Sequence, residues 1–340
     1  MLVVASDRHR AHRMLEVHDG VIADSSEGPA RADLIADALR RGDHEFVEPE
    51  ALDHDLVRRV HAPDYVDFLA GAWDEWIAQG HDAPAAMGFM WPARGFAERR
   101  PASLVGRLGW YSFSADTSIV AGTFAAVESS AAIAMTAADR LLDGDDASVY
   151  ALCRPPGHHA SSDQFGGYCF LNNAAIAAQR LLDRGSGRVG ILDVDYHHGN
   201  GTQSITYERA DIVFASIHAS PDEEFPWFAG FANETGSGAG DGANLNLPLP
   251  KGADVGTWFT ALAEALVFLA DSDLDALVVS LGVDTYEDDP LGTFRLTTSD
   301  FTKVANEIGM LALPTVIVQE GGYATGAIGD NVEAFLSACP

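Results

Sequence analysis

The sequence predicts an α/β protein in which helices cover both faces of a wound, mostly parallel sheet. Five short apolar runs, rich in β-branched residues, have the composition of strands buried on both faces; they lie at residues 148–152, 189–194, 212–217, 276–281 and 315–318. Helical stretches alternate with these runs at residues 172–183, 255–270 and 299–311, and Asn172 and Ser299 suit helix capping. Such alternation is typical of a single parallel sheet.

The part of the chain before these runs is predicted to be mostly helical and to pack on the sheet. Residues 29–41 and 64–76 have helical patterns, whereas residues 2–5 form only a weak strand candidate. The apolar stretch at residues 117–142 contains two carboxylates, which indicates a buried helix rather than a membrane span. We therefore expect one domain over residues 1–340 that has no membrane partner.

Composition excludes several classes of protein. The 340 residues include 21 Lys and Arg against 50 Asp and Glu, a formal net charge of −29. Nucleic-acid binding needs a basic surface, so the chain is not expected to bind nucleic acid, and its negative field instead favours cations. The three scattered cysteines fit neither a disulfide framework nor a zinc knuckle, and the N-terminus lacks the apolar run of a signal peptide. The expected location is a reducing cytoplasm.

Residues 79–113 interrupt the alternation of strands and helices. They contain five glycines, three prolines and six aromatic residues. The segment is too long for a simple connection and too aromatic for disorder. We expect an inserted loop that contacts a second subunit, with a lid folded back on the molecule as the alternative.

Reactive side chains follow nearly every predicted strand. Ligands bind just beyond the carboxyl ends of the strands in open parallel sheets. Residues 153–159 follow the first strand, Asp195, His197 and His198 follow the second, Asp284 follows the fourth, and residues 320–323 follow the fifth. One His or Asp at a strand end is usually an ordinary loop residue, but four strand ends in agreement predict a functional site.

Asp195, His197 and Asp284 have the pattern of a catalytic metal site. The first two are two residues apart on an extended segment, so their side chains face the same side, and Asp284 can join them from a neighbouring strand. Three protein ligands leave a fourth position open for water, whose pKa zinc lowers to about 7. The pattern favours zinc, and iron(II), manganese or cobalt would also fit these ligands.

His158, His159 and Tyr323 are candidates for the proton transfers. The two histidines follow a Pro-Pro-Gly segment that restricts the backbone. Beside a metal-bound water, one of them could accept a proton and later donate it to a leaving amine. Tyr323 lies on a Gly-Gly turn and offers a phenol O–H of the kind that stabilises an oxyanion.

Taken together, these residues resemble the zinc-dependent histone deacetylase superfamily with its arginase-like α/β fold, and especially its bacterial acetylpolyamine amidohydrolases. The resemblance extends over essentially the whole chain. It rests on five stretches in this order: Arg-Pro-Pro-Gly-His-His-Ala at 154–160, Phe-Gly-Gly-Tyr-Cys-Phe-Leu-Asn-Asn at 165–173, Leu-Asp-Val-Asp-Tyr-His-His-Gly-Asn-Gly-Thr-Gln at 192–203, Ser-Leu-Gly-Val-Asp at 280–284 and Gln-Glu-Gly-Gly-Tyr at 319–323.

The resemblance implies a role for each site residue. The zinc ligands would be Asp195, His197 and Asp284. Tyr323 and the metal would polarise the acetyl carbonyl, His159 would act as general base and acid, and His158 would stabilise the transition state. Asp193 and Asn200 would stand behind His158 and His159 respectively. Tyr168 and Phe225 would grip the aliphatic stem of the substrate, with Gly167 beside them.

The resemblance also implies a potassium ion with a structural role. It would be bound by the side chains of Asp193 and Ser216 and by main-chain carbonyls of Asp193, Asp195, His197 and Ile217. Binuclear manganese relatives need a further Asp where this chain has Gly199, so an arginase-type reaction is disfavoured.

The expected substrate is a small cationic acetylated amine. Acetylpolyamine hydrolases share an N-terminal insertion that builds a dimer and narrows the active-site tunnel, and residues 79–113 lie where that insertion would be. The resemblance therefore implies a homodimer and a slender substrate. Glu16 and Asp116 match acidic positions that recognise distal ammonium groups, whereas Val105 stands at another such position.

We expect zinc-dependent hydrolysis of acetylated polyamines, such as acetylputrescine and acetylspermidine, to acetate and free amine. One alternative is a deacylase of other small acyl amines or of acetyl-lysine peptides, which would use the same chemistry. The other is a cation-binding module that keeps the fold and has lost catalysis.

Overall fold

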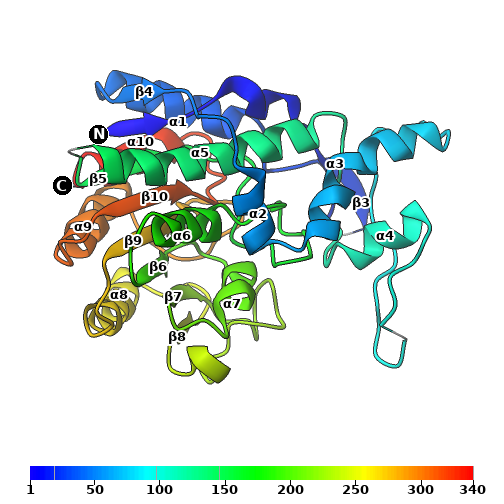
Figure 1. Ribbon diagram of the computed structural model, residues 1–340. Coiled ribbons are helices and arrows are strands. Elements are labelled where there is room, and N and C mark those ends of the chain that lie inside the picture. Colours follow the sequence, from blue (N-terminus) through cyan, green and yellow to red (C-terminus); the bar gives the residue numbers. More distant parts are fainter. Residues whose placement is uncertain (19, 97, 145, 340) are drawn as a thin grey trace.

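The computed structural model describes residues 1–18, 20–96, 98–144 and 146–339, and its centre is an eight-stranded sheet (Figure 1). Every pair of neighbouring strands in this sheet is parallel, and the strand order is β4-β1-β5-β10-β9-β6-β7-β8. The strands are β1 (Leu2–Val4), β4 (Glu45–Val47), β5 (Ser148–Ala151), β6 (Val189–Asp193), β7 (Ile212–Ala219), β8 (Asn244–Leu249), β9 (Ala276–Leu281) and β10 (Thr315–Gln319). The predicted fold class is confirmed.

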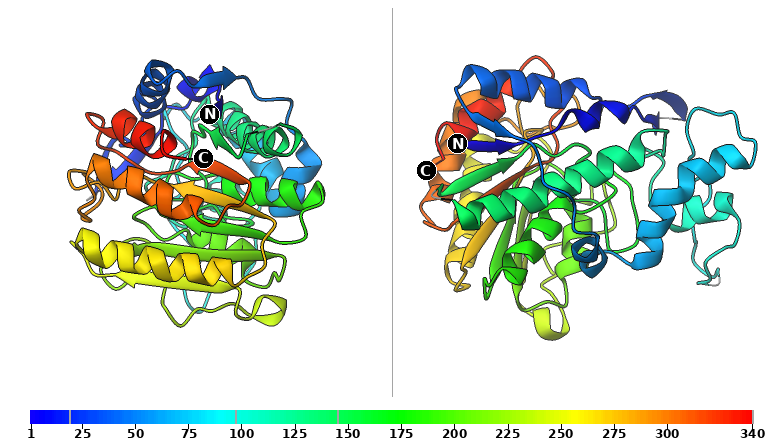
Figure 2. Two further views of the ribbon diagram at one scale, coloured as in Figure 1. Left: turned by 90° about the vertical axis from the view of Figure 1, so that its left-hand side faces the viewer. Right: turned by 45° about the horizontal axis from the view of Figure 1, so that its top comes forward.

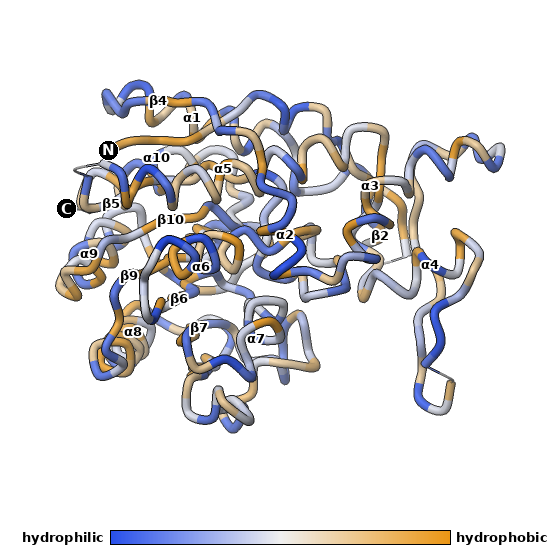
Figure 3. The backbone as a smooth tube through the Cα atoms, in the orientation of Figure 1, coloured by the Kyte–Doolittle hydropathy of each residue, from blue (hydrophilic) through white to orange (hydrophobic). Residues whose placement is uncertain are grey.

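Helices cover both faces of the sheet (Figures 1 and 2). One face packs against α1 (Ala30–Arg41), α8 (Val255–Ala270), α9 (Thr298–Gly309) and α10 (Ile328–Leu336). The other packs against α5 (Thr123–Asp143) and α6 (Asn173–Asp183). Successive residues of β6 enter the two cores in turn, with Ile191 in one and Leu192 in the other. Burial on both faces explains why the central strands, such as β9 and β10, are largely apolar runs; β10 is orange in Figure 3.

A third apolar cluster extends the molecule beyond the sheet. It contains side chains of α2 (His54–Val60), α3 (Pro63–Ala78) and α4 (Leu104–Trp110), together with the outer sides of α5 and α6. It contains several buried aromatic rings. The ring of Phe165 stacks on that of Phe170 with centroids 5.4 Å apart, and the ring centroids of Phe68 and Tyr111 are 4.6 Å apart. In the right-hand view of Figure 2, α3 and α4 (light blue to cyan) project to one side of the sheet.

Helix starts follow from local capping chemistry. Asn172 caps α6 by accepting a hydrogen bond from the amide of Ala175, as the sequence predicts. The cap of α9 differs from the prediction, because Thr297 rather than Ser299 is the N-cap and forms a capping box with Asp300. The capping box begins this helix one residue earlier than the pattern indicated.

Several elements escaped the sequence analysis. Residues 2–5, a weak strand candidate in the sequence, contain β1, but β4 and the separate antiparallel hairpin of β2 (Leu15–His18) and β3 (Val21–Asp24) were not predicted. A short helix, α7 (Asn200–Thr206), follows residues 194–199 after β6. Strand β8 was missed because its sequence, NLNLPL, contains residues that are poor strand formers. Residues 79–113 are not a loop throughout, since they contain α4, which Ser103 caps.

Among the helices of the described ranges, none is both long enough and apolar enough to cross a membrane.

Candidate active site

The candidate site lies beyond the carboxyl ends of the central strands. Asp195 and His197 follow β6 by two and four residues, and Asp284 follows β9 by three. Because β6 and β9 are neighbours in the sheet, these side chains meet. His158 and Tyr323 come from the segments after β5 and β10. Polar residues that follow four different strands therefore lie together at one edge of the sheet, as the sequence predicts.

Asp195, His197 and Asp284 form a compact donor set. Each offers one ligand atom, and these atoms all lie within 4.8 Å of one another. Nδ1 of His197 lies 3.0 Å from Oδ2 of Asp284 and 3.4 Å from Oδ1 of Asp195. Both carboxylates are 0% exposed. Burial, and then repulsion by Asp195, raises the pKa of Asp284 to about 7. Two buried carboxylates beside one imidazole are chemically suited to a divalent cation.

The backbone leaves no room for a side chain next to this donor set. A Cβ on Gly321 would lie 2.5 Å from both Oδ2 of Asp195 and Oδ2 of Asp284. The amide of Gly321 instead donates to Oδ2 of Asp195 at 2.8 Å, and the amide of Tyr196 donates to Oδ1 of Asp284 at 2.9 Å. Backbone donors therefore orient the carboxylates and leave their remaining lone pairs for a ligand.

The histidine pair is electrostatically asymmetric. Nδ1 of His158 lies 3.0 Å from Oδ2 of Asp193, whereas Nδ1 of His159 lies 2.7 Å from Oδ1 of Asn200. Burial disfavours the charged form of His158, but Asp195 and Asp193 outweigh it and raise its pKa to about 10. Burial, followed by the two neighbouring histidines, holds the pKa of His159 well below its usual value. A carboxylate behind one ring and an amide behind the other divide the pair into a charged and a neutral member.

Tyr323 lies at the inner end of the cavity. Its ring meets that of Tyr168 edge to face, with centroids 5.8 Å apart, and the guanidinium of Arg31 lies 4.7 Å from its centroid. Burial raises the pKa of the Tyr323 phenol well above its usual value, even though Arg31 opposes the shift. The hydroxyl is therefore protonated at neutral pH and can donate a hydrogen bond.

An open cavity of about 610 Å³ leads to His159, His197 and Tyr323. Several aromatic side chains line its wall: Trp91, Phe113, Tyr168, Phe225, Trp227 and Phe228. Phe225 meets His159 edge to face at 4.9 Å, so this ring lies next to the reactive end. The geometry accommodates a narrow aliphatic chain between aromatic rings.

Asp116 and Glu16 have different places. Asp116 borders the cavity, and its Oδ1 accepts a hydrogen bond from the amide of Gly167 at 2.9 Å. Glu16 is only 7% exposed and does not line the cavity; it accepts a hydrogen bond from Ser25 at 3.1 Å. Burial, and then the carboxylate of Glu16, raises the pKa of Tyr168 far above its usual value. Glu16 thus lies behind the aromatic wall rather than at the mouth.

Gly167 faces the ring of His159. Its φ of +55° lies in the left-handed region, and a Cβ there would come within 2.4 Å of the His159 ring. Tyr168, the next residue, also has a positive φ, of +67°. This turn brings the backbone against His159 and places the Tyr168 ring in the cavity wall.

The residues expected to bind potassium lie on two neighbouring strands. Asp193 ends β6 and is the register partner of Ser216 on β7, with Ile217 next to it. Asp193 is already engaged, because its Oδ2 contacts His158 and its Oδ1 accepts the amide of Asp195 at 3.1 Å. Oγ of Ser216 lies 2.8 Å from Nδ1 of His218. Potassium binding here stays a prediction.

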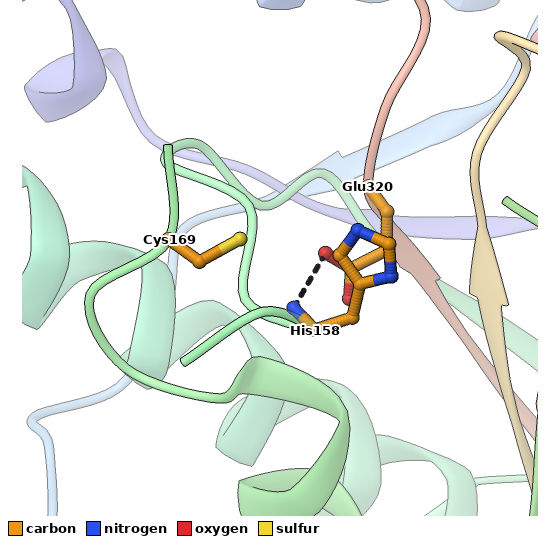
Figure 4. Close-up of side chains that lie close together, drawn as sticks. All are labelled: His158, Cys169 and Glu320. Carbon is orange, nitrogen blue, oxygen red and sulfur yellow. Dashed lines mark hydrogen bonds between the residues drawn. The ribbon is translucent and has the colours of Figure 1, made fainter. Parts of the chain in front are cut away.

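Glu320 belongs to the motif at residues 319–323, and the structure assigns it a role. Its Oε2 accepts the backbone amides of Gly157 at 2.7 Å and His158 at 3.1 Å, the second of which is dashed in Figure 4. Glu320, His158 and the Cys169 thiol form a second group of potential ligands. Nδ1 of His158 is committed to Asp193, and burial raises the pKa of Cys169 well above its usual value. The group therefore supports the histidine loop rather than a second ion.

A parallel α/β sheet with this Asp-His-Asp set, paired histidines and a phenol at one cavity has the groups that a hydrolase would need to hold a metal ion and to transfer protons. Residues 25–339 match the histone deacetylase domain, and the chain belongs to that family. The chain is 48% identical over 335 residues to acetylpolyamine amidohydrolase 2 of Pseudomonas aeruginosa. The aligned region covers 97% of this chain and 96% of that protein.

Other relatives agree along nearly the whole chain. The acetylpolyamine amidohydrolase of Mycoplana ramosa is 44% identical over 338 residues, covering 99% of this chain and 98% of that one. The crystal structure of an acetylpolyamine aminohydrolase from Burkholderia pseudomallei superposes with a TM-score of 0.94 at 37% identity, covering 99% of this chain and 98% of that chain.

Proposed function

We propose that the protein is a zinc-dependent amidohydrolase that removes the acetyl group from acetylated polyamines. The carrying observation is that Asp195, His197 and Asp284 meet His159 and Tyr323 at the inner end of one cavity. The full-length similarity to acetylpolyamine amidohydrolases supports the substrate class. The products would be acetate and the free amine.

Asp195, His197 and Asp284 would hold the zinc ion. When bound, zinc acts as a Lewis acid and lowers the pKa of a water ligand to about 7. Until a cation neutralises them, the two buried carboxylates repel each other, as the raised pKa of Asp284 indicates. A bound cation would therefore balance the negative charge of the two carboxylates.

His159 is the general base and acid of the proposed reaction. Oδ1 of Asn200 can only accept, so it selects the tautomer with a proton on Nδ1 of His159 and leaves Nε2 unprotonated. Nε2 then takes a proton from the attacking water and returns it to the leaving amine. His158, held by Asp193, supplies positive charge beside the developing oxyanion, and Tyr323 donates its O–H to the acetyl oxygen.

Charge at the cavity supports a cationic substrate. Among the described residues that line it, the carboxylates are Asp116 and Glu224, and neither lysine nor arginine is present. Glu224 forms an ion pair with Lys251, whereas Asp116 is anchored by hydrogen bonds from Ser114, Thr117 and Gly167. An anchored carboxylate among aromatic rings favours an ammonium group.

The first test is kcat/KM of the zinc-loaded protein on N-acetylputrescine, N8-acetylspermidine and an acetyl-lysine peptide. We expect the free polyamines to be preferred. Asp116→Asn, which keeps the Oδ1 acceptor, should raise KM for the polyamines and leave a neutral acetamide unaffected. Preference for the peptide would favour the alternative, a deacylase of other acyl amines. A zinc-loaded protein without turnover of any acetamide would favour a cation-binding module.

Tyr323→Phe tests the mechanism. Loss of an oxyanion donor should lower kcat about 100-fold or more and leave KM nearly unchanged. Unchanged turnover would remove Tyr323 from the proposed reaction.

We also propose that the single domain is a cytoplasmic homodimer that contains structural potassium. Residues 79–113 support the dimer: Phe89, Met90 and Phe96 are 74%, 61% and 56% exposed beside an apolar hollow of about 240 Å³. Phe89→Glu with Phe96→Glu should give a monomer by light scattering, and an unchanged mass would refute this interface.

For the proposed potassium ion, exchange of the protein from potassium into sodium salt should lower the unfolding temperature. An identical unfolding temperature in both salts would contradict potassium binding.

A further inference from the structure

The loop that carries Tyr323 is held through its backbone. Residues 320–324 lie between β10 and α10 and have no regular secondary structure. Asp289, from the loop after β9, is only 6% exposed. Its Oδ2 accepts the backbone amides of Tyr323 at 2.6 Å and Ala324 at 2.9 Å, and its Oδ1 accepts the amide of Leu291 at 3.0 Å. One buried carboxylate therefore satisfies three amides of two loops.

We propose that Asp289 is a positioning residue that fixes the phenol of Tyr323 for catalysis. The proposal rests on the proposed function, in which Tyr323 donates to the acetyl oxygen. Within the described part of the chain, no residue forms a hydrogen bond with the Tyr323 hydroxyl, so its place depends on the backbone of Tyr323 and on the packing of its ring against Tyr168 and Arg31. Displacement of a reacting group by about 1 Å can cost about 100-fold in rate.

Arg31 binds carbonyl oxygens of the same loop and shares the Gly322–Tyr323 peptide with Asp289. Its guanidinium donates to the carbonyl oxygens of Glu320 at 2.7 Å and Gly322 at 2.5 Å, and it lies against the Tyr323 ring. Carbonyls of the loop meet a cation, and amides of the loop meet the carboxylate of Asp289. Loss of the carboxylate leaves the amides of Tyr323 and Ala324 without their acceptor, which frees this part of the loop.

The same carboxylate couples the phenol to the cavity wall. Leu291 lines the cavity with Tyr323, and both amides bind Asp289. The wall and the phenol therefore keep a fixed separation. Asp289 acts through these two residues and does not itself line the cavity.

Asp289→Asn is the test variant, since it replaces one acceptor oxygen by an NH₂ group that faces backbone donors. Asp288→Asn is the matched control, because Asp288 is exposed and precedes Asp289 directly. We expect Asp289→Asn to lower kcat about 100-fold, with KM changed less than about threefold, and the control to behave as the wild type. Any acetamide that the wild type hydrolyses serves, so the test does not depend on the substrate class.

A double-mutant cycle with Tyr323→Phe separates positioning from general stability. Once the hydroxyl is gone, Asp289→Asn should lower kcat less than about twofold further. A full additional loss in the Tyr323→Phe background would overturn the proposal. If Tyr323→Phe alone keeps wild-type turnover, the proposed role of Tyr323 fails first, and the positioning role fails with it.

Hydrogen exchange tests the clamp without activity. The amides of Tyr323 and Ala324 should be protected in the wild type although they lie outside helices and strands, and Asp289→Asn should speed their exchange. Fast exchange of these amides in the wild type would overturn the proposal even if the variant does not fold. A protein inactive on every acetamide but protected at these amides would refute the proposed function and leave the clamp in place.

Discussion

The buried His61 makes the stability of the fold depend on pH in a way that one substitution can isolate. His61 is 2% exposed and sits just before α3. Its Nδ1 lies 2.9 Å from the carbonyl of Ser161, and its Nε2 accepts the amide of Asn172 at 2.9 Å. These partners require a neutral ring, since a proton on Nε2 would face the amide N–H of Asn172.

Burial lowers the pKa of His61 from 6.5 to about 4. Hydrogen bonding to the backbone of Ser161 and Ser162 raises this pKa, but by less than burial lowers it. Between these two values the unfolded chain binds a proton that the folded chain does not, so stability falls as pH falls below 6.5. Linkage gives a loss of about 2.5 kcal/mol between pH 7 and about pH 4.5 from this residue alone.

His61→Gln should remove this contribution. The variant should be less stable than the wild type at pH 7 by about 1 kcal/mol, because the bond to Ser161 is lost. Its stability should then fall less steeply with acid, so that the difference from the wild type shrinks and reverses by about pH 4.5. The other buried histidines titrate in both proteins, and their effect cancels.

The assay is reversible urea unfolding followed by tryptophan fluorescence at several pH values. His54→Gln is the control, since the His54 side chain is 58% exposed, and its curve should run parallel to that of the wild type. Parallel curves for His61→Gln and the wild type over this pH range would refute the claim that His61 is held neutral by its surroundings.

Three further outcomes follow from packing and charge. Gly321→Ala would place a methyl group 2.5 Å from the carboxylates of Asp195 and Asp284, so if these bind zinc as proposed, zinc content by mass spectrometry and turnover should both collapse, while Gly326→Ala, with open space around it, should retain both. Asp139→Asn should destabilise the fold by about 3 kcal/mol in urea unfolding, because the nearly buried Asp139 pairs with Arg180 and Arg184; a loss below about 0.5 kcal/mol would mean that solvent screens the pair. Because the net charge is −29, added potassium chloride should raise the unfolding temperature, and a constant temperature would show that self-repulsion is unimportant.

The sequence was sufficient for the sheet and for the residues at its carboxyl edge. Both depend on local signals: apolar β-branched runs form the strands, and parallel strands bring their ends to one edge. Asp195 and Asp284 could therefore be placed together although 89 positions separate them in the chain. The ligand pattern favoured zinc among several metals, whereas the division between the histidines and the substrate class came from the resemblance.

What depends on tertiary packing could not be predicted. Glu16 was expected at the mouth of the cavity, yet the β2–β3 hairpin turns it inward against Ser25, because a carboxylate on a strand faces whichever side the hairpin packs. Asp289 is one carboxylate among fifty acidic residues, and only the approach of the β10 loop gives it three backbone donors. No local pattern distinguishes such a residue from a solvated one.

The turn after β10 explains why the donor set, the histidines and the phenol form one unit. Glu320 holds the amide of His158, Gly321 holds a carboxylate oxygen of Asp195, and the amide of Tyr323 is held by Asp289. Three successive contacts over four residues leave the turn little freedom to move one group without the others. A substitution that shifts this turn should therefore reduce metal affinity and turnover together, whereas loss of the Asp289 clamp, at the far end of the turn, should affect turnover alone.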